Sequence, residues 1–332
     1  MAHQIEPHQY TTQRAVSCCG VGLHTGRTVN LTINPAPANT GIQFLRSDLA
    51  EKPVFPARVE RVVDTTLATT IGDGRNRIST TEHLLAALRG FGIDNAIIDL
   101  DSHEVPIMDG SAGPFCRLLK TAGRRQQQVL RKILRITRPI DHVQGNKSIR
   151  IEPYDGYKVS ARIQFDDALI SEQCYSLEVT PEHFVKEIAS ARTFGFVEQV
   201  EQLWQNGLAL GGTLDNVIAI HWNRRSILNE NGLRFDDEFI RHKVLDVIGD
   251  MALLGSPLMG HVIADRSGHG LHRDFMKAII DNPHCWEYVT FKKKGDSLFR
   301  QVVQSSQPSG HRFAPFFAPL GERIAPSPAC AM

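Results

Sequence analysis

The chain has 332 residues and a formal net charge of +1, with 37 lysines and arginines against 36 aspartates and glutamates, and its length suffices for two domains. Because no dense basic segment stands out, we expect no nucleic-acid partner and no helix that lies on a membrane surface. No uncharged apolar run approaches the roughly 20 residues that cross a bilayer, and residues 1–14 lack a secretory signal, so the sequence predicts a cytoplasmic protein without a membrane span.

The first half of the chain combines strands with short helices. Alternating apolar residues predict the strands, and apolar residues with helical spacing predict the helices. The predicted strands are 28–33, 42–45 and 95–100, and the predicted helices are 84–88 and 114–121. The turn-rich stretch between the first two strands predicts that they pair as a hairpin, and Ser111 is positioned to cap the start of the second helix.

A basic, glutamine-rich stretch, residues 125–131, is predicted to link a first domain, residues 13–124, to a second domain, residues 132–304. The predicted strands of the second domain are 132–136, 147–152, 158–165, 261–265 and 286–291, and its helices are 181–188, 197–206 and 239–254. Residues 1–12 are predicted to be a flexible extension. Residues 305–332 lack clear periodicity and are rich in Pro, Ser and Ala, which predicts a loose tail.

One histidine lies early in a helix in each half. His83 and His242 both belong to predicted helices that a glycine and a strand follow, which indicates an internal duplication with one ligand group in each half. Asp246 lies four residues after His242 and projects from the same helix face. Two imidazoles and one carboxylate suit zinc with a fourth position left for water, although iron(II) accepts the same set and a solvated helix edge would also carry such residues.

Two further residues are candidates for proton transfer. Glu82 adjoins the first histidine and could act as a base, but Ser79-x-x-Glu82 also fits a capping box, which is the favoured role from spacing alone. His269 lies between glycines, where a flexible loop would let it protonate a leaving amine, and Asp250 is a candidate to orient it. The alternatives are a loop histidine without a role, and His272 as the acid in its place.

A glycine-rich segment at residues 20–26 lacks the Lys-Ser/Thr ending of a phosphate loop and is not followed by a predicted helix. We therefore interpret it as a tight turn that brings His24 near the cleft.

Two rival functions remain at this point. A zinc peptidase would carry His-Glu-x-x-His on one helix, whereas the two pieces here lie about 160 residues apart. A structural metal site or a nucleic-acid-binding face is the non-enzymatic alternative.

Seven sequence blocks together resemble the UDP-3-O-acyl-N-acetylglucosamine deacetylases, zinc amidases that catalyse the committed step of lipid A biosynthesis. The blocks are GVGLHTG, STTEHLLAAL, PIMDGSAGPF, SARTFGFV, LGGTLDN, LRFDDEFIRHKVLDVIGD and SGHGLH. They run in order from about residue 14 to residue 291. Residues 64–70 depart from the pattern, because they lack a cysteine that some members carry near the metal, so metal inhibition or exchange is expected to differ while catalysis is not.

The resemblance implies the residues that carry out hydrolysis of a 2-acetamido group. It implies that His83, His242 and Asp246 bind Zn2+. It also implies that Glu82 is the general base rather than a helix cap, and that His269 protonates the departing nitrogen. Acetate and a free 2-amino sugar would result.

The same resemblance implies supporting roles for five other residues. Asp250 is the carboxylate partner of the acid, and Thr193 stabilises the oxyanion beside the metal. Phe194 and Lys243 contact the sugar and diphosphate parts of the substrate. His24 lies at the edge of the same cleft.

The fold that the resemblance implies is α+β, with two similar α/β-layered domains, small inserts and the active site at the domain interface. An insert near residues 206–220 of the second domain is expected to form an apolar passage for the acyl chain. The implied partner is a UDP-sugar lipid precursor that binds a monomer. A regulatory protease that acts on the C-terminal tail is a further candidate partner.

Overall fold

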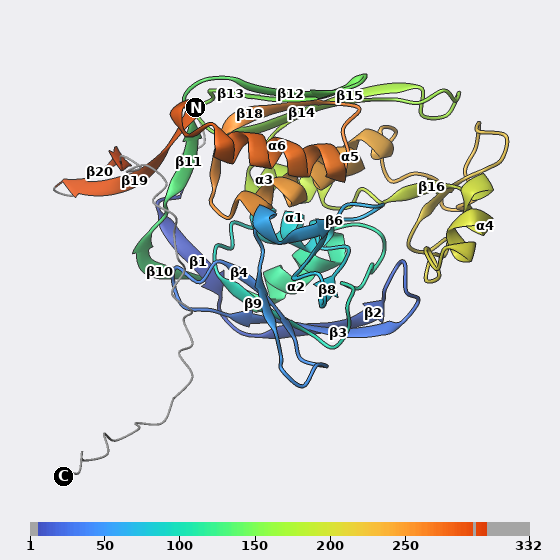
Figure 1. Cartoon of the computed structure of the whole chain (residues 1–332), viewed down its shortest axis with the longest axis horizontal. Helices are drawn as coiled ribbons and strands as arrows, with labels where there is room; N and C mark the ends of the chain where they lie inside the picture. Colours follow the sequence, from blue (N-terminus) through green and yellow to red (C-terminus); the bar gives the residue numbers. More distant parts are fainter. Residues whose placement is uncertain (1–5, 295–296, 304–332) are drawn as a thin grey trace, which may run out of the picture.

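The computed structural model describes residues 6–294 and 297–303 and places helices between two outer sheets (Figure 1). The sheet at the bottom of that view has the strand order β2-β3-β9-β4-β5. Its strands are β2 (Val16–Val21), β3 (Thr28–Pro35), β4 (Ile42–Arg46), β5 (Val54–Pro56) and β9 (Ala96–Leu100). Helices α1 (Glu82–Gly90) and α2 (Gly113–Ala122) lie on its inner side. This mixed architecture agrees with the predicted α+β class.

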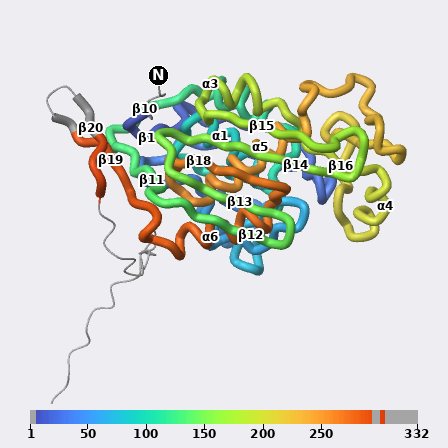
Figure 2. Tube along the Cα trace, turned by 90° about the horizontal axis from the view of Figure 1, so that it is seen from above, coloured from blue at the N-terminus to red at the C-terminus, as the bar shows by residue number. Residues whose placement is uncertain are grey.

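The second sheet contains eight strands, with β18 near its middle. Its strands are β11 (Ile133–Ile136), β12 (Ile140–Gln144), β13 (Lys147–Glu152), β14 (Tyr157–Gln164), β15 (Glu172–Glu178), β18 (Leu258–Asp265), β19 (Trp286–Lys294) and β20 (Ser297–Val303). Strand β18 pairs antiparallel with β13 and parallel with β14. Figure 2 shows this sheet lying across helices α5 (Glu238–Met251) and α6 (His269–Asp281). The molecule is thus layered as sheet, helices, helices, sheet.

Smaller elements fill the connections. Three short strands form a sheet of their own: β6 (Val62–Asp64), β7 (Thr70–Gly72) and β8 (Arg77–Ile78). The short helical elements are η1 (Val59–Arg61), α3 (Pro181–His183), the π-helical turn η2 (Phe184–Ile188), η3 (Ala252–Leu254) and η4 (Pro283–Cys285). A β–α–β unit projects at one end of the molecule and consists of β16 (Phe194–Phe196), α4 (Val197–Gln205) and β17 (Ile218–Ile220), whose strands are parallel (Figure 1). The insert expected at 206–220 corresponds to only the second part of this unit.

The predicted hairpin of the first two strands is wrong. Strand β9 lies between β3 and β4, antiparallel to the first and parallel to the second. The alternation expected over residues 28–33 is present, because Val29, Leu31 and Ile33 are all buried. A turn-rich connection shows that the chain reverses, but the neighbour of a strand depends on which apolar face packs best. Ala96, Ile98 and Leu100 of β9 are fully buried in the middle of this sheet.

The structure also corrects the expected flexible extension and linker. Residues 8–12 form β1 (His8–Thr12), which pairs antiparallel with β10 (Arg124–Leu130) across the segment that was expected to be a connector. The Arg124 guanidinium lies 3.9 Å from the centre of the Tyr10 ring and pairs with Glu6. Strand formation here depends on a partner over 100 residues away, which local composition does not reveal. Residues 1–5 and the predicted tail, residues 305–332, lie outside the described residues.

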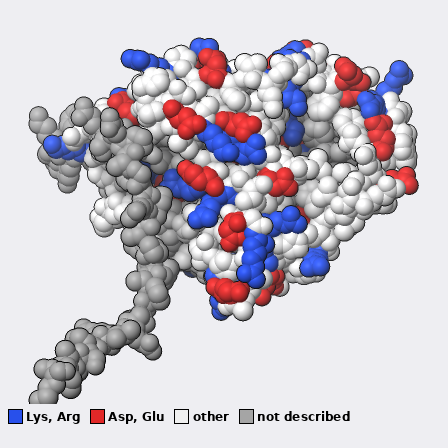
Figure 3. All heavy atoms as spheres, in the orientation of Figure 1, with Lys and Arg blue, Asp and Glu red and all other residues white. Residues whose placement is uncertain are grey.

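The surface carries charges of both signs. Figure 3 shows acidic and basic side chains intermixed over the face it presents. Exposed pairs such as Arg150 with Asp141 each contribute little to stability, because solvent screens them. Within the described residues, no helix is both long and apolar enough to span a membrane.

Helices α1 and α5 pack directly against each other in the middle of the molecule. Gly249 of α5 makes this contact possible, because a Cβ atom at that position would lie 2.1 Å from the backbone oxygen of Glu82. The first turn of α1 therefore rests on the backbone of α5. A glycine inside a helix destabilises that helix by about 0.5–1 kcal/mol relative to alanine. The close packing of α1 on α5 that Gly249 allows offsets this loss.

Gly249→Ala is expected to destabilise the protein by about 1–3 kcal/mol, because overpacking outweighs the gain in helix propensity. It should also displace α1 relative to α5 and weaken binding of any ligand shared between them. Gly195→Ala serves as the control, since a Cβ there meets nothing within 4 Å. Denaturant unfolding of both variants measures the difference, and equal stability of the two would contradict the steric explanation.

Candidate metal centre and active site

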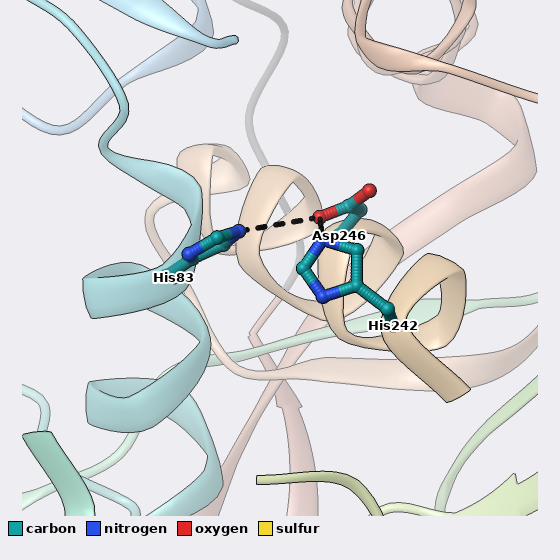
Figure 4. Close-up of side chains that lie close together, drawn as sticks. All are labelled: His83, His242 and Asp246. Carbon is teal, nitrogen blue, oxygen red and sulfur yellow. Dashed lines mark ion pairs between the residues drawn. The ribbon is translucent and has the colours of Figure 1, made fainter. Parts of the chain in front are cut away.

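Three side chains expected to bind a metal point toward one another at the contact between α1 and α5 (Figure 4). Nε2 of His242 lies 3.4 Å, and Nε2 of His83 lies 3.8 Å, from the same Oδ1 atom of Asp246. All three are buried. A tetrahedral zinc ion with bonds of about 2.0–2.1 Å places its ligand atoms roughly 3.4 Å apart. The spacing therefore fits a divalent ion between them, with donor atoms that suit zinc.

Neighbouring groups orient two of these side chains. Nδ1 of His242 donates to the backbone oxygen of Ala191 at 3.1 Å, which leaves the Nε2 lone pair directed at the centre. The Lys243 ammonium donates to Oδ2 of Asp246 at 2.9 Å, so only Oδ1 faces the imidazoles. These contacts fix the orientation of two potential ligands before any ion binds.

Electrostatics place the cluster in the protonation state that a metal requires. Burial lowers the pKa of His83 to about 3 and lowers the pKa of His242 below its ordinary value. Burial opposes ionisation of Asp246, but the Lys243 ammonium and the surrounding imidazoles together outweigh it and hold the pKa of that carboxyl far below its usual range. Neutral imidazoles and an ionised carboxylate are the forms that coordinate a cation.

A second group of titratable side chains, Asp250, His269 and His272, lies close to the first. Nδ1 of His269 and Nδ1 of His272 donate to the same Oδ2 atom of Asp250, at 2.8 and 2.7 Å. These are hydrogen-bond lengths, shorter than the separation of two ligands on one ion. His272 is fully buried and its other nitrogen contacts Ser267, at 2.8 Å. We therefore assign this cluster to proton handling, with His269 as the better exposed imidazole.

The position of Glu82 contradicts the capping-box alternative. Helix α1 begins at Glu82 itself, and the amide of Ser79 donates to the backbone oxygen of His103 instead. Oε2 of Glu82 accepts from the amide of Thr69 at 3.0 Å, and Oε1 lies 3.9 Å from Nε2 of His269. The carboxylate thus faces the acid candidate rather than its own helix.

Thr69 is a site residue that the sequence patterns did not reveal. Its hydroxyl donates to Oδ1 of Asp250 at 2.6 Å, while its amide binds Glu82, so it joins the two carboxylates. The only signal was its position in the segment 64–70, which departs from the family pattern. A threonine in a connection before a short strand carries no periodicity that could identify it.

The two proton-transfer candidates, Glu82 and His269, have strongly shifted pKa values. Burial, with the carboxylates of Asp250 and Asp246 nearby, raises the pKa of Glu82 to about 7. Burial would lower the pKa of His269, but the Asp250 carboxylate outweighs it and raises the pKa to about 10. At neutral pH the pair thus consists of a carboxyl able to gain or lose a proton and an imidazolium able to donate one.

His269 does not lie in a flexible loop, as its flanking glycines had suggested. It is the first residue of α6, and Gly268 precedes it as the capping residue in extended conformation. Its hydrogen bond to Asp250 fixes the ring, so its position results from the helix and the carboxylate rather than from mobility. Gly268 therefore caps the start of α6 and is not part of a flexible loop.

The expected substrate-contact residues lie along the edge of the metal cluster. Phe194 packs edge-on against Phe239 and its ring centre lies 6.4 Å from that of His242. Lys243 Nζ lies 5.5 Å from the centre of the Phe194 ring. The amide of Thr193 donates to the backbone oxygen of Gly110 at 2.9 Å, which ties this segment to the first half of the chain.

His24 is placed at a contact between distant segments. Its amide donates to the buried carboxylate of Glu104, and its backbone oxygen accepts from the amide of Leu210 in the β16–β17 unit. Neither ring nitrogen has a hydrogen-bond partner among the described residues. These hydrogen bonds join His24 to Glu104 and Leu210 and not to His83 or Asp246, so a place at the cleft edge remains a prediction.

A buried ion pair holds the segment that precedes Phe194 against α5. The Glu238 carboxylate accepts from the amide, Nε and Nη2 of Arg192, at 2.9, 2.9 and 3.0 Å. It also accepts from the amide of Arg234, at 2.6 Å. Glu238 is fully buried, so this carboxylate organises the backbone that carries Ala191 and Thr193.

Glu238→Gln is expected to reduce the free energy of unfolding by about 3–5 kcal/mol, because it leaves the guanidinium of Arg192 buried without a counter-charge. Glu198→Gln is the matched control. Its partner Arg224 is exposed, and such a pair contributes about 0–1 kcal/mol. Urea unfolding of both variants tests the difference, and a loss below about 1 kcal/mol in Glu238→Gln would show that the pair is energetically unimportant.

Comparisons with known proteins find a matching family model and several similar chains. A family model described as UDP-3-O-acyl N-acetylglycosamine deacetylase matches residues 9–281. A relative from Methylococcus capsulatus named UDP-3-O-acyl-N-acetylglucosamine deacetylase is 48% identical over 289 residues, which cover 86% of this chain and 94% of the relative. Proteins of the same name from Idiomarina loihiensis and Oleidesulfovibrio alaskensis are 47% and 44% identical, covering 86% and 96% of this chain and 94% and 99% of the relatives.

Proposed function

Because this chain belongs to the UDP-3-O-acyl N-acetylglycosamine deacetylase family, we propose that it hydrolyses the 2-acetamido group of UDP-3-O-acyl-N-acetylglucosamine. The products are acetate and UDP-3-O-acyl-glucosamine, and the reaction is the committed step of lipid A biosynthesis. One observation carries the proposal. The three buried potential metal ligands lie at the contact between α1 and α5, and next to them lies a separate acid–base pair, in which Nε2 of His269 is 3.9 Å from Oε1 of Glu82. A structural metal site would not need that second cluster.

We infer that His83, His242 and Asp246 hold Zn2+, because their donor atoms have the spacing, burial and protonation that this ion requires. When bound, zinc supplies a Lewis acid that polarises the acetyl carbonyl and lowers the pKa of water. Iron(II) accepts the same ligand types and is the alternative metal. Among the described residues this set has three members, which leaves room in a four-coordinate site for water or substrate.

The proton transfers follow from the acid–base pair. Glu82 accepts the proton of the attacking water as the new C–O bond forms, which its raised pKa permits. His269 then donates its Nε2 proton to the nitrogen as the C–N bond breaks, while Asp250 stabilises the imidazolium through Nδ1. The Thr193 hydroxyl is proposed to stabilise the oxyanion of the tetrahedral intermediate. The remaining hydroxyl proton of the intermediate passes back to His269, so that acetate and a neutral amine leave, and Glu82 releases its proton to solvent before the next turnover.

The substrate is proposed to lie along the edge formed by Phe194 and Lys243. The ammonium of Lys243 is close enough to Phe194 for a sugar to contact both, and its charge suits a diphosphate. The acyl chain is proposed to enter a passage bordered by the β–α–β unit and the insert 206–220, where Leu210 and Leu214 are exposed. His24, bonded to the same insert, would lie at the edge of the cleft.

The arrangement of layers supports a two-domain organisation with an active site between the domains. Helices α1 and α5 each carry ligand residues and are each followed by a glycine and a strand of the adjoining sheet. We propose that this repeat reflects an internal duplication, with boundaries near residue 124 and residue 132. A cytoplasmic monomer, and control by a protease acting on residues 305–332, belong to the same proposal.

Acetate release from UDP-3-O-acyl-N-acetylglucosamine by the purified chain, with and without a chelator, tests the proposal. We expect release that the chelator abolishes and that added Zn2+ restores. The same substrate lacking the 2-acetyl group is the control, since it offers no bond to break. Absence of chelator-sensitive release under conditions in which the protein retains metal would overturn the proposed function.

A further inference from the structure

A cavity of about 200 Å3 lies at the end of α1 that is remote from the metal cluster. Segments of both halves of the chain line it, including residues 39–43 and 85–95 of the first half and residues 252–257 of the second. Because α1 rises about 1.5 Å per residue, Arg89 lies roughly 9 Å along the axis from His83. The cavity is therefore distinct from the site described above.

Two half-buried arginines of this cavity have no carboxylate partner among the described residues. Nη2 of Arg89 donates to the backbone oxygen of Ser256 at 3.1 Å, and Nη1 of Arg58 donates to that of Leu254 at 3.1 Å. Each guanidinium has five N–H groups, so most of its donors are not used by these carbonyls. Burial lowers the pKa of Arg89 to about 10, which still leaves it charged at neutral pH.

The negative groups of the cavity do not balance these charges. Its single lining carboxylate, Asp94, is already engaged by Arg131 through Nε and Nη2 and by the amide of Tyr10. The carbonyl ends of the two adjacent helices contribute about half a unit of negative charge each. The exposed Lys132, whose ammonium lies 4.0 Å from the centre of the Tyr288 ring, adds a fourth cation to the lining besides the three arginines, so positive charge remains in excess.

We propose that this cavity is a binding site for a small phosphate-type anion, held by the free N–H groups of Arg58 and Arg89 with Lys132 at its mouth. Two guanidinium groups that line one cavity can match the oxygens of a phosphate, and half-buried cations without an ion pair are stabilised when an anion binds between them. A neighbouring cavity also includes Arg89, but Glu6 and Glu178 line it and make it a poorer anion site.

The size of the cavity favours a small anion over a whole nucleotide. Drug-sized ligands occupy pockets of about 300–1,000 Å3, whereas this cavity is smaller and needs to hold only a phosphate group with some water. Its walls include the last residues of α1 and the segment that follows η3. An anion would therefore bridge the C-terminal ends of α1 and of the α5–η3 segment, whose earlier turns carry the metal-site residues, and should stabilise their packing.

Titration calorimetry with inorganic phosphate, at constant ionic strength on the full zinc-loaded chain, tests this site. We expect one phosphate per chain and a rise in Tm, with binding at least tenfold weaker in the double variant Arg58→Gln/Arg89→Gln. Glutamine retains an amide donor for the carbonyls. Arg125→Gln, at an exposed arginine outside the cavity, should bind like the unchanged chain. Equal affinity in the double variant, or no binding at all, would overturn the proposal.

Two measurements separate this site from the metal centre and from loss of folding. His83→Ala should retain the phosphate affinity, because the proposed anion does not contact the metal ligands; loss of binding in that variant would place the phosphate at the metal instead. On the unchanged chain, phosphate should protect Arg58 and Arg89 from phenylglyoxal, detected by peptide mass spectrometry, at least fivefold relative to Arg125. Absence of protection would also contradict the proposal.

Discussion

Replacing Glu82 by glutamine is expected to lower kcat for acetate release at least about a hundredfold, because an amide cannot accept the proton of the attacking water. Glutamine has nearly the same shape, and its oxygen can still accept the Thr69 amide, so the start of α1 should be preserved. The zinc content should stay near that of the unchanged chain, since Glu82 is not one of the proposed ligands. Steady-state kinetics and metal analysis on the same preparation measure both quantities.

His269→Ala provides the companion measurement. It removes the acid rather than the base, and its kcat should fall by a similar factor with zinc retained. The double variant should be little worse than either single one, because two groups that act in one proton relay are not additive. Full turnover in Glu82→Gln would remove that residue from the mechanism, and loss of zinc together with turnover would make it a structural residue instead.

His83→Ala is expected to abolish stable zinc binding and to reduce turnover by about a thousandfold, the equivalent of roughly 4 kcal/mol of transition-state stabilisation. Removal of one of three ligands leaves His242 and Asp246 on α5 without their counterpart on α1. Added zinc should not restore the rate at concentrations that restore the chelator-treated parent chain. Metal content after dialysis, followed by kinetics across a zinc titration, tests this expectation.

The control for the metal prediction is His272→Ala. His272 is equally buried and hydrogen-bonded to Asp250, but it belongs to the proton-handling cluster. This variant should retain zinc, even if it turns over more slowly. A His83→Ala chain that binds zinc as tightly as the parent, or a His272→Ala chain that loses it, would show that the two clusters have been assigned the wrong way round.

The two clusters illustrate how separation between donor atoms distinguishes their chemistry. Around Asp246 the imidazole nitrogens lie 3.4 and 3.8 Å from the carboxylate, too far for strong hydrogen bonds and suitable for a shared cation. Around Asp250 they lie within 2.8 Å, which stabilises a protonated imidazole. The same residue types thus suit a shared metal ion in one place and a retained proton in the other.

Much of the candidate site was predictable because its parts are local. The four-residue spacing of His242 and Asp246 requires only that residues 239–254 be helical, and the helix is present. The helix that carries Glu82 and His83 was likewise recognisable from its apolar spacing. Sequence spacing supported both a cap and a base for Glu82. The structure excludes the cap, because α1 begins at Glu82, the Ser79 amide donates to His103 and the carboxylate accepts from the Thr69 amide.

Local patterns were insufficient wherever the partner lies far along the chain. The pairing of β1 with β10 and the placement of β9 between β3 and β4 join segments that no periodicity connects. The same holds for Thr69, whose role arises from a contact with Asp250, 181 residues later. His269 was a candidate from the sequence but was assigned to a loop, whereas it begins α6, because glycine is as compatible with a helix start as with a turn.

The sequence by itself indicated helices α1, α2, α4 and α5 and part of the strands, but not α6 or strands such as β2, β12 and β15. It also indicated which residue types are available for metal binding and proton transfer, and which family the chain resembles. The tertiary structure decided which of those groups meet. The physical reason is that periodicity encodes the face each element buries, whereas the distance between His83 and Asp246 depends on the packing of α1 against α5 at Gly249.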